Sequence, residues 1–499
     1  MAFTRSQALE MAQIRSTINT IELITPTNYP AEKQRWLDGG RKFFNPQFTY
    51  DTEAIKDAIR RIDSLAPLED VFRGNASYYE FFQYYARFAG EALQKRYEEL
   101  TNLKIFLQTL IDPANIMPGD HYHNPLYHLY GDITPEDVKF ANLLIEYKPQ
   151  EAYSHQFVEG DISADYWGIT HRKSFFDGAL RGFKGMFSKE DKAKLRAMEL
   201  DAEGIAKYFQ LVLDYMRKNA QYGAAMTREE KEAPTYYIEV SPKWTAISVN
   251  AFSESGKSVI GIPADRKING LKLVELVSHE LNSHYRSAMS TRAYFRNLLD
   301  PYGNSCPILP LIPMMSHSLD ETLSEGLAKI GDIRVSGEAG MPKPYQVLAI
   351  DFVQHGHNFK ETMEYVFELT RQNHKTENTA LNNAWNYTYR IFRGQRDTSS
   401  KCGYAFPKDK VYLCGFTTVV QNAANWGATS QHFEQFMNLL RYSTLTLEEL
   451  DSLDSQQSGA DYVVGHDSYP RWEYDQLGFQ SKYDPCPDPV EYVASLLLN

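Results

Sequence analysis

The chain has 499 residues, of which 43% are hydrophobic and 23% are charged, a composition typical of a folded globular protein and not of a disordered chain. Its formal net charge of −12 argues against nucleic acid or an anionic membrane as the main partner. Its four cysteines lie far apart without a Cys-x-x-Cys pair, which excludes a disulfide framework or a zinc ribbon and indicates a reducing compartment.

Neither a signal peptide nor a membrane span is expected. The first ten residues carry charged and polar groups where a signal peptide needs an apolar run. The most apolar segment, residues 306–315, is short and contains three prolines, so we expect it to be a loop. The sequence therefore predicts a cytoplasmic protein that does not insert into a membrane.

The first 230 residues are expected to be mostly helical. Thr134 has the character of a helix N-cap, because Pro135 follows at the first helical position and acids fill the first turn. Ser188, followed by Lys-Glu-Asp, is expected to open a long helix that runs towards Lys218.

The residue pattern changes after residue 234. Residues 235–241 and 244–262 are rich in Val, Ile, Tyr and Thr, with Glu-Ser-Gly-Lys at 254–257 as a turn, which predicts a small antiparallel sheet. In metallopeptidases an edge strand of this kind pairs with the substrate backbone, and residues 247–253 are the candidate. A plain core hairpin is the equally weighted alternative.

A helix is expected to begin after Asn269, whose side chain can cap it. The buried side of this helix should carry Leu273, Leu276 and Val277. The helix also contains the clearest chemical signal of the chain, His-Glu-Leu-Asn-Ser-His at residues 279–284. Zinc hydrolases take two imidazoles from one helix and use the adjacent Glu as a general base. His279 and His284 are therefore candidate zinc ligands, and Glu280 is the candidate base.

The spacing of the two histidines requires a distorted helix. The usual zincin motif has two residues between the Glu and the second His, whereas this chain has three. At about 100° per residue, positions five apart lie roughly 140° apart around an α-helix, so both rings could not face one ion. We therefore predict a π-bulge or a break between Glu280 and His284. The alternative is that two ordinary histidines match the motif by accident.

A third zinc ligand is expected downstream, on a helical stretch at residues 319–330. Glu325, immediately before Gly326, is the candidate ligand, because zinc sites of this kind take a Glu from a second helix. Glu321, one turn earlier, would lie on the same face and orient a histidine. An amphipathic helix with two solvated acids is the alternative for this stretch taken alone.

The remainder of the chain is expected to be helical again, near residues 345–372, 376–394, 409–427 and 446–458. The last forty residues are aromatic, acidic and proline-containing, and are expected to wrap the surface. The predicted division is an N-terminal helical region at 1–90, a catalytic domain at 91–458 and a C-terminal extension at 459–499. The predicted fold class is α+β, mostly helical, with the small antiparallel sheet before the active-site helix.

Several stretches resemble one family, the tyrosine carboxypeptidases related to microtubule-associated tyrosine carboxypeptidase, whose bacterial relatives are called QEGLA-motif proteins. The resemblance begins with His-Glu-x-x-x-His and the Glu-Gly-Leu-Ala element at 325–328. Further similar stretches are Asn-Pro-Gln-Phe-Thr-Tyr at 45–50, Leu-Tyr-Gly at 129–131, Arg-Ile-Phe-Arg-Gly at 390–394, and the segment at 406–415 that contains Lys-Asp and Tyr-Leu-x-Gly. Together they span roughly residues 40–450.

The resemblance implies a zincin-like metallopeptidase in which His279, His284 and Glu325 bind Zn²⁺ and Glu280 is the catalytic acid/base. The chain departs from the family pattern at three places. Ser324 replaces the usual Gln or Glu before the ligand Glu, Ser287 replaces an Arg that commonly follows the second His, and Leu-Asn-Ser replaces the common Ile-Gly-Thr within the motif. These departures leave the expected metal ligands in place.

Two other patterns in the sequence could suggest different chemistry. Residues 251–258 formally match a relaxed phosphate-binding loop, but the following residues are strand-like where a helix is required. The histidines His121, His123, His128, His355 and His357 could suggest a second metal site. They lack acid partners at a fixed spacing, which favours ordinary surface or core histidines.

A carboxypeptidase needs a cation that binds the terminal carboxylate of its substrate. Arg390, Arg393 and Lys408 lie in the family-like segment and are the candidates, and Tyr412 is a candidate hydrogen-bond donor to the developing oxyanion. The alternative for each cation alone is a structural ion pair.

The function predicted from the sequence is a zinc metallocarboxypeptidase that removes a C-terminal residue, tyrosine or another aromatic, from a protein or peptide with a free C-terminus. In that reaction Zn²⁺ polarises the carbonyl and Glu280 transfers a proton to the leaving amine. The alternatives are a catalytically weak regulatory or binding protein on the same fold and a zinc endopeptidase.

Overall fold

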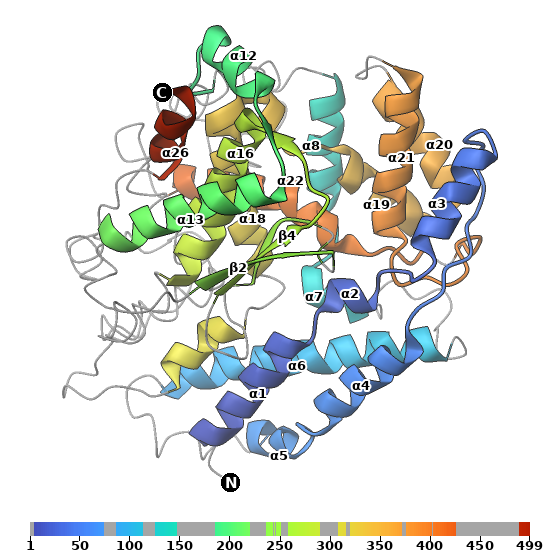
Figure 1. Cartoon of the computed structure of the whole chain (residues 1–499). Helices are drawn as coiled ribbons and strands as arrows, with labels where there is room; N and C mark the ends of the chain where they lie inside the picture. The colour runs from blue at the N-terminus through green and yellow to red at the C-terminus, as the bar shows by residue number, and fades with distance from the viewer. Residues whose placement is uncertain are drawn as a thin grey trace.

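The computed structural model describes residues 4–73, 86–112, 125–146, 185–219, 236–242, 244, 246–250, 258–289, 308–315, 320–371, 376–401, 403–425 and 489–499. Within these residues the chain is mostly helical with a few short strands, which agrees with the predicted α+β class (Figure 1). None of the described helices is both long enough and apolar enough to span a lipid bilayer.

The N-terminal part of the chain is helical, as predicted. Its helices are α1 (Arg5–Thr17), α2 (Thr20–Leu23), α3 (Tyr29–Asp38), α4 (Thr52–Asp63), α5 (Pro67–Arg73), α6 (Ala86–Ile111), α7 (Pro125–Tyr130) and α8 (Pro135–Glu146). Side chains cap several of these helices: Asp51 accepts the backbone N–H of Ala54 in α4, and Thr134 accepts the backbone N–H of Asp137 in α8. The N-cap expected at Thr134 is therefore confirmed. In Figure 1, α1, α4, α5 and α6 lie below the rest of the molecule.

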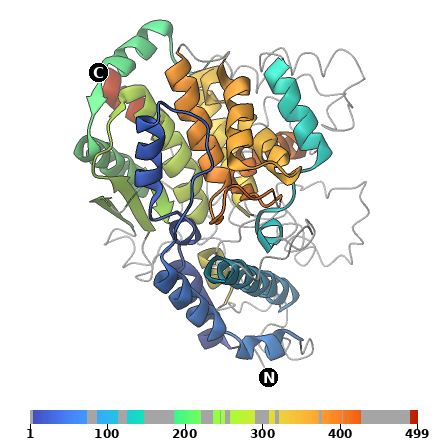
Figure 2. The same ribbon diagram turned by 90° about the vertical axis from the view of Figure 1, so that its right-hand side faces the viewer.

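A first hydrophobic core joins α1 to α7 to three helices from the second half of the chain: α19 (Tyr345–Gln354), α20 (Phe359–Arg371) and α21 (Glu377–Ile391). The indole rings of Trp36 and Trp385 stack at its centre, with ring centroids 4.8 Å apart, and Phe359 packs edge-on against Trp385. Figure 2 shows α3 beside these later helices. The N-terminal helices therefore share a core with the second half of the chain.

Two family-like stretches far apart in the sequence bind each other through Tyr50. Its hydroxyl accepts the N–H of Gly394 at 3.0 Å and donates to the carbonyl of Gln395 at 2.9 Å. Gly394 has a φ of 80°, a backbone conformation that favours glycine. Because Tyr50 is buried, these two bonds hold the end of α21 in a defined position.

The long helix expected from Ser188 is interrupted. Ser188 does cap a helix, but α12 (Lys189–Ala197) ends where Met198 becomes extended. The short strand β1 (Glu199–Leu200) follows and pairs antiparallel with β5 (Ile268–Asn269). A second helix, α13 (Ala202–Asn219), then begins under the cap of Asp201, which accepts the N–H of Gly204. The pairing of β1 with β5, far along the chain, thus interrupts the helix that the local sequence predicted.

The main sheet is mixed, so the prediction of an antiparallel sheet was wrong in part. Its strands are β2 (Tyr236–Ser241), β3 (Ser248–Asn250) and β4 (Ser258–Pro263), in the order β2-β4-β3. β3 and β4 are antiparallel, with Val249 opposite Ile260, but β2 runs parallel to β4, with Ile238 opposite Ile260. The expected turn at 254–257 lies outside the described residues. Because β4 is a strand, the residues after the phosphate-loop-like pattern do not open a helix.

A second hydrophobic core lies on the other side of the molecule. It is formed by α12, α13, the main sheet, α16 (Gly270–Leu276), the π-helix η4 (Val277–Tyr285) and the C-terminal helix α26 (Pro489–Leu498). Asn269 caps α16 by accepting the N–H of Lys272 at 2.8 Å, and Leu273, Leu276 and Val277 are buried, as predicted.

The final residues contribute to this second core instead of only wrapping the surface. Val490, Val493 and Leu497 of α26 are buried in it, and α26 contacts η4. The aromatic stretch at 459–488 and the helix expected at 446–458 lie outside the described residues. The division into three domains stays a prediction.

Between the two cores, α18 (Asp320–Ser336) packs against both η4 and α22 (Val411–Asn425). A Cβ atom on Gly326 of α18 would overlap the carbonyl of Gly415 in α22, and a Cβ on Gly415 would overlap the carbonyl of Thr322. On the other side of α18, a Cβ on Gly331 would overlap Ser278 Oγ. These glycines therefore allow the backbone of α18 to approach α22 and η4 more closely than any larger residue would.

Short 3₁₀ segments connect these elements: η5 (Leu309–Met314), η6 (Gly337–Gly340) and η7 (Pro407–Lys410). η5 falls within the apolar stretch that was expected to be a loop. Its Leu309, Leu311 and Ile312 are buried in the first core, which explains the apolar composition without a membrane.

The close crossing of α18 and α22 yields a stability prediction. Gly326→Ala and Gly415→Ala should each destabilise the folded chain by about 1–3 kcal/mol or more, because overpacking forces two backbones apart. The midpoint of urea unfolding measures this loss. Gly204→Ala in α13 is the matched control, since its nearest neighbours are side-chain atoms at 3.3 and 3.4 Å, and alanine favours a helix. Wild-type stability in both crossing variants would contradict the close contact.

Candidate metal centre

The two motif histidines lie on a π-helix, which confirms the predicted distortion. The helix is α-helical from Gly270 and π-helical from Val277 to Tyr285. In a π-helix the backbone hydrogen bond joins residues i and i+5, so His284 lies above His279 as an i+4 residue does in an α-helix. The hydroxyl of Ser283 also donates to the carbonyl of Ser278 at 3.0 Å, five residues earlier. The π-helix thus explains how two histidines five residues apart can lie on the same face of the helix.

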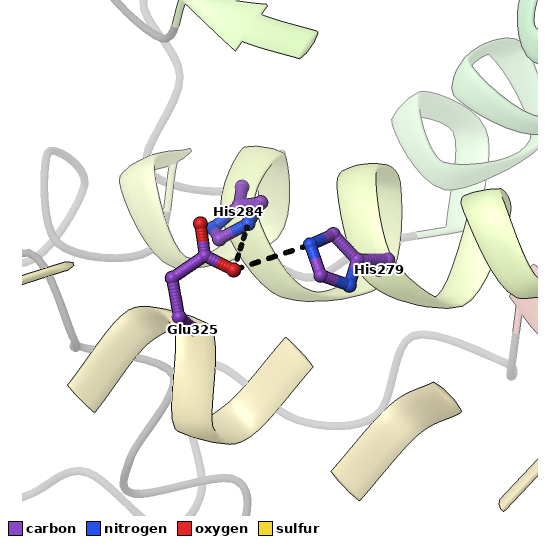
Figure 3. A group of neighbouring side chains, drawn as sticks. All are labelled: His279, His284 and Glu325. Carbon is purple, nitrogen blue, oxygen red and sulfur yellow. Dashed lines mark ion pairs between the residues drawn. The ribbon is translucent and has the colours of Figure 1, made fainter. Parts of the chain in front are cut away.

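The structure brings His279, His284 and Glu325 together, and their possible ligand atoms all lie within 4.8 Å of one another. Glu325 Oε2 lies 3.3 Å from His279 Nε2 and 3.7 Å from His284 Nε2. Figure 3 shows the carboxylate of Glu325 rising from α18 towards the two rings. The three side chains therefore form one group, drawn from two facing helices as predicted.

This group fits a zinc ion in distance and in chemistry. At zinc–ligand distances of about 2.0–2.1 Å, tetrahedral ligand atoms lie about 3.3–3.4 Å apart, close to the two separations from Glu325. Oε2 of Glu325 is buried and receives no hydrogen bond of acceptable geometry, so its contacts with the rings are ion-pair contacts only. A buried carboxylate oxygen without a well-aligned hydrogen bond is costly, and a cation between the three atoms would satisfy it.

Each histidine has a second partner at its other ring nitrogen. His279 Nδ1 lies 3.3 Å from Asp332 Oδ2, and His284 Nδ1 lies 2.7 Å from Ser324 Oγ. The prediction that Glu321 orients a histidine was wrong, because its carboxylate pairs with Lys408 Nζ at 2.7 Å. Glu321 faces Lys408 of η7, whereas Asp332, two turns beyond Glu325, reaches His279.

The electrostatics of the group are those of an anionic site that attracts positive charge. Burial would raise the pKa of Glu325, but the two histidines outweigh it and lower that pKa to about 2. Burial would lower the pKa of His279, but Asp332 and Glu325 raise it to about 10. Burial lowers the pKa of His284 to about 4. Without a metal, a proton on His279 thus supplies the positive charge between two carboxylates, a place that a metal cation can take.

Glu280, the residue after His279, is buried. Burial raises the pKa of its carboxyl to about 7, with the neighbouring carboxylates adding to the rise and His279 opposing it. A group that titrates near neutral pH can both accept and donate a proton, which is the property of a general acid/base.

Of the four candidate substrate-binding residues, Tyr412 and Lys408 lie near the metal group, whereas Arg390 and Arg393 lie farther away. Tyr412 is half-buried, and the charge of Glu325 raises the pKa of its phenol. The charge of Lys408 lowers the pKa of both His284 and Glu325. The guanidinium of Arg390 lies over the ring of Tyr412, 6.0 Å from its centroid, and pairs with Asp409 at 2.6 Å.

Arg393 lies elsewhere, over the ring of Tyr389 at 5.1 Å. None of the contacts found among the described residues joins it to the histidines or to Glu325. Of the three candidate cations, Lys408 is therefore the one whose charge acts most directly on the metal group.

Among the residues that the structure describes, His355 and His357 belong to no group that could hold a metal, as predicted, but each has the acid partner at a fixed spacing that was not expected: Asp351 and Glu361 lie four positions away, both at 3.5 Å. His355 is exposed and lies 3.5 Å from Asp351, and the ring of His357 stacks on Phe352 with centroids 3.6 Å apart. Within the described residues, His279, His284 and Glu325 are the one group found that could hold a metal. His121 and His123 lie outside the described residues, as does the side chain of His128.

Two residues that contact the histidines, Asp332 and Ser324, were not predicted from the sequence. A signal for Asp332 was present: it follows Glu325 by seven positions, which places it on the same face of an α-helix two turns later. Ser324 was noted only as a departure from the family pattern. Its contact with His284 could not be read from spacing, because it depends on how α18 faces η4.

Comparison with protein-family models matches residues 344–460 to the family described as microtubule-associated tyrosine carboxypeptidase. The resemblance to this family is confirmed. The match covers well under half of the chain and spans α19 to α22, with Arg390, Lys408 and Tyr412. The tyrosine carboxypeptidase match does not include η4 or α18, so the metal ligands rest on the geometry of this chain. Comparisons with curated proteins and with solved structures gave no significant match.

The geometry predicts which variants lose metal. His284→Ala and Glu325→Ala should each retain little zinc, because two protein ligands rarely hold the ion. Zinc content of the purified full chain, measured by elemental mass spectrometry, tests this. Matched controls are His355→Ala, an exposed histidine, and Glu321→Ala, an acid on the same helix whose partner is Lys408. Stoichiometric zinc in Glu325→Ala together with its loss in Glu321→Ala would show that the wrong acid was assigned.

Proposed function

We propose that this chain is a zinc-dependent metallocarboxypeptidase that removes a C-terminal residue, tyrosine or another aromatic, from a protein or peptide. The observation that carries the proposal is the buried, unpartnered Oε2 of Glu325 between the Nε2 atoms of two histidines, with Glu280 next to one of them. The tyrosine carboxypeptidase match supports the activity and the aromatic preference.

His279, His284 and Glu325 would hold the zinc ion. When bound, zinc would supply a Lewis acid that polarises the scissile carbonyl and lowers the pKa of a water molecule towards about 7. The carboxylate of Glu280 would accept a proton from water and then donate it to the amine nitrogen of the leaving residue. Its raised pKa, caused by burial, suits both halves of this transfer.

Tyr412 and Lys408 are proposed to bind the substrate around the scissile bond. Tyr412 lies close enough to Glu325 for that carboxylate to be the largest influence on its pKa. Its phenol O–H would therefore be available to donate to the oxyanion, because the raised pKa keeps it protonated at neutral pH. Lys408 would bind the terminal carboxylate of the substrate in competition with Glu321, its present partner.

The strand β3 is proposed to align the substrate backbone. β3 is an edge of the three-stranded sheet and contacts η4, the helix that carries both histidines. Within the described residues it pairs with β4 along one edge, which leaves the other as the candidate for an added strand. Residues 251–253 of the expected strand lie outside the described residues.

Recognition of a free chain end is the property that distinguishes the proposed carboxypeptidase from an endopeptidase. A peptide that ends in tyrosine as the free acid should be cleaved at its last bond, and C-terminal amidation should lower kcat/KM about tenfold to a hundredfold. This range follows from roughly 1.5–3 kcal/mol for one charge-assisted contact. Mass spectrometry of the products identifies the bond. Equal cleavage of acid and amide would indicate an endopeptidase instead.

Lys408→Met should reduce cleavage of the free acid by a similar factor and leave the slow reaction on the amide almost unchanged. Because this substitution leaves Glu321 without its cation, the double variant Lys408→Met/Glu321→Gln removes the unpaired charge. Lys401→Met is the matched control, since Lys401 is more exposed and pairs with Glu361. Wild-type kinetics in the double variant would show that another cation binds the terminal carboxylate of the substrate. Arg390 would then be the next residue to test.

Removal of the general base separates catalysis from metal binding. Glu280→Gln should keep stoichiometric zinc, because no ligand is lost, and should lower kcat by about 10²–10⁴, the usual contribution of general acid–base catalysis. Zinc content and steady-state kinetics on the same sample provide the two measurements. A wild-type chain that binds zinc but hydrolyses no C-terminal peptide bond would favour the binding-protein alternative.

A further inference from the structure

The two histidines of the metal group use their ring nitrogens in the same way. In both, Nε2 faces Oε2 of Glu325, and Nδ1 faces a second polar atom outside the group. For His279 that atom is a carboxylate oxygen of Asp332, and for His284 it is the hydroxyl of Ser324. A neutral imidazole donates from one nitrogen and accepts at the other, so the outer partner decides which nitrogen can bind a cation.

Both outer partners come from α18, the helix that also provides Glu325. Ser324 directly precedes Glu325 in the sequence, and Asp332 follows it by two helical turns. One helix therefore supplies a ligand and the orienting contacts of the other two ligands. Any shift of α18 relative to η4 would disturb all three together.

The two outer partners differ in what they require of the imidazole. An ionised carboxylate can only accept, so Asp332 requires a proton on Nδ1 of His279 and leaves the Nε2 lone pair for a metal. A hydroxyl can accept or donate, so Ser324 permits the same tautomer in His284 without requiring it. The contact with Ser324 is the shorter of the two, at 2.7 Å against 3.3 Å.

Asp332 is itself held in place by a cation. Lys329, one turn earlier on α18, donates from Nζ to the same oxygen, Oδ2, at 2.8 Å. The side chain of Asp332 is only 8% exposed, and its Oδ1 is buried without a hydrogen-bond partner. Lys329 thus holds the buried carboxylate in place, and the oxygen that it contacts is the one that faces His279.

We propose that Asp332 and Ser324 are positioning residues that turn Nε2 of His279 and of His284 towards the metal, with Asp332 as the stronger determinant. The inference rests on the proposed zinc site and adds to it the residues that set ligand orientation and tautomer. Lys329 acts through Asp332 and keeps that carboxylate in place.

The test is zinc affinity of the folded full chain, measured by competition with a chromophoric chelator. Asp332→Asn should weaken zinc binding about tenfold to a hundredfold, the usual effect of losing an outer-shell partner. Ser324→Ala should weaken it by a smaller factor, and Ser324→Thr, which keeps the hydroxyl, should restore most of the affinity. Controls are Asp214→Asn, an acid that pairs with Arg217 in α13, and Ser336→Ala on α18 itself.

Two further readouts separate positioning from a structural role. The melting temperature of the metal-free variants should stay near that of the wild type, and the visible absorption of the Co²⁺-loaded Asp332→Asn variant should change, because ligand orientation alters it. Zinc affinity equal to wild type in Asp332→Asn would overturn this inference alone. A wild-type chain that binds no zinc would overturn the proposed function, and this inference with it.

Discussion

The candidate site depends on how closely α18 approaches its two neighbours. Glycines make this approach possible: Gly326 meets Gly415 of α22 on one side, and Gly331 leaves space for Ser278 of η4 on the other. Each acid that contacts a histidine is adjacent to one of these glycines in the sequence, Glu325 beside Gly326 and Asp332 beside Gly331. The helix backbone, and not long flexible side chains, therefore carries both carboxylates to the imidazoles.

The buried charges of this region impose a cost that the rest of the fold must balance. Removing carboxylates from water is unfavourable unless cations or donors meet them, and both Asp332 and the Oε2 atom of Glu325 are buried. Apolar packing around α18 supplies the burial that holds these charges together: Leu323, Leu327, Ala328 and Ile333 are buried, and Val335 belongs to the second core. Binding of a divalent cation to such a group is coupled to folding, because an unfolded chain does not bring the three ligand atoms together.

Local patterns predicted much of this structure. The spacing from His279 to His284 indicated a distorted helix, Asn269 indicated where that helix begins, and Glu325 was identified as the acid from a second helix. The errors have a common cause in contacts between distant segments. The parallel pairing of β2 with β4 and the strand that interrupts the helix after Ser188 both depend on partners far along the chain. The orienting role expected of Glu321 failed for the same reason, because Lys408, 87 positions later, takes its carboxylate. Spacing shows which residues share a helix face but not which neighbour that face meets.

The π-helix of η4 also has a consequence for how such sites are found in genomes. A π-turn places one extra residue in a helix while the helix continues in the same direction, and the residues after Tyr285 are again α-helical. In an alignment with a His-Glu-x-x-His protein, the extra residue would appear as a single gap opposite one of residues 281–283. In space, the two imidazoles would still lie on one face. A search pattern with fixed spacing passes over the chain, whereas one that tolerates a single insertion inside the motif retrieves it.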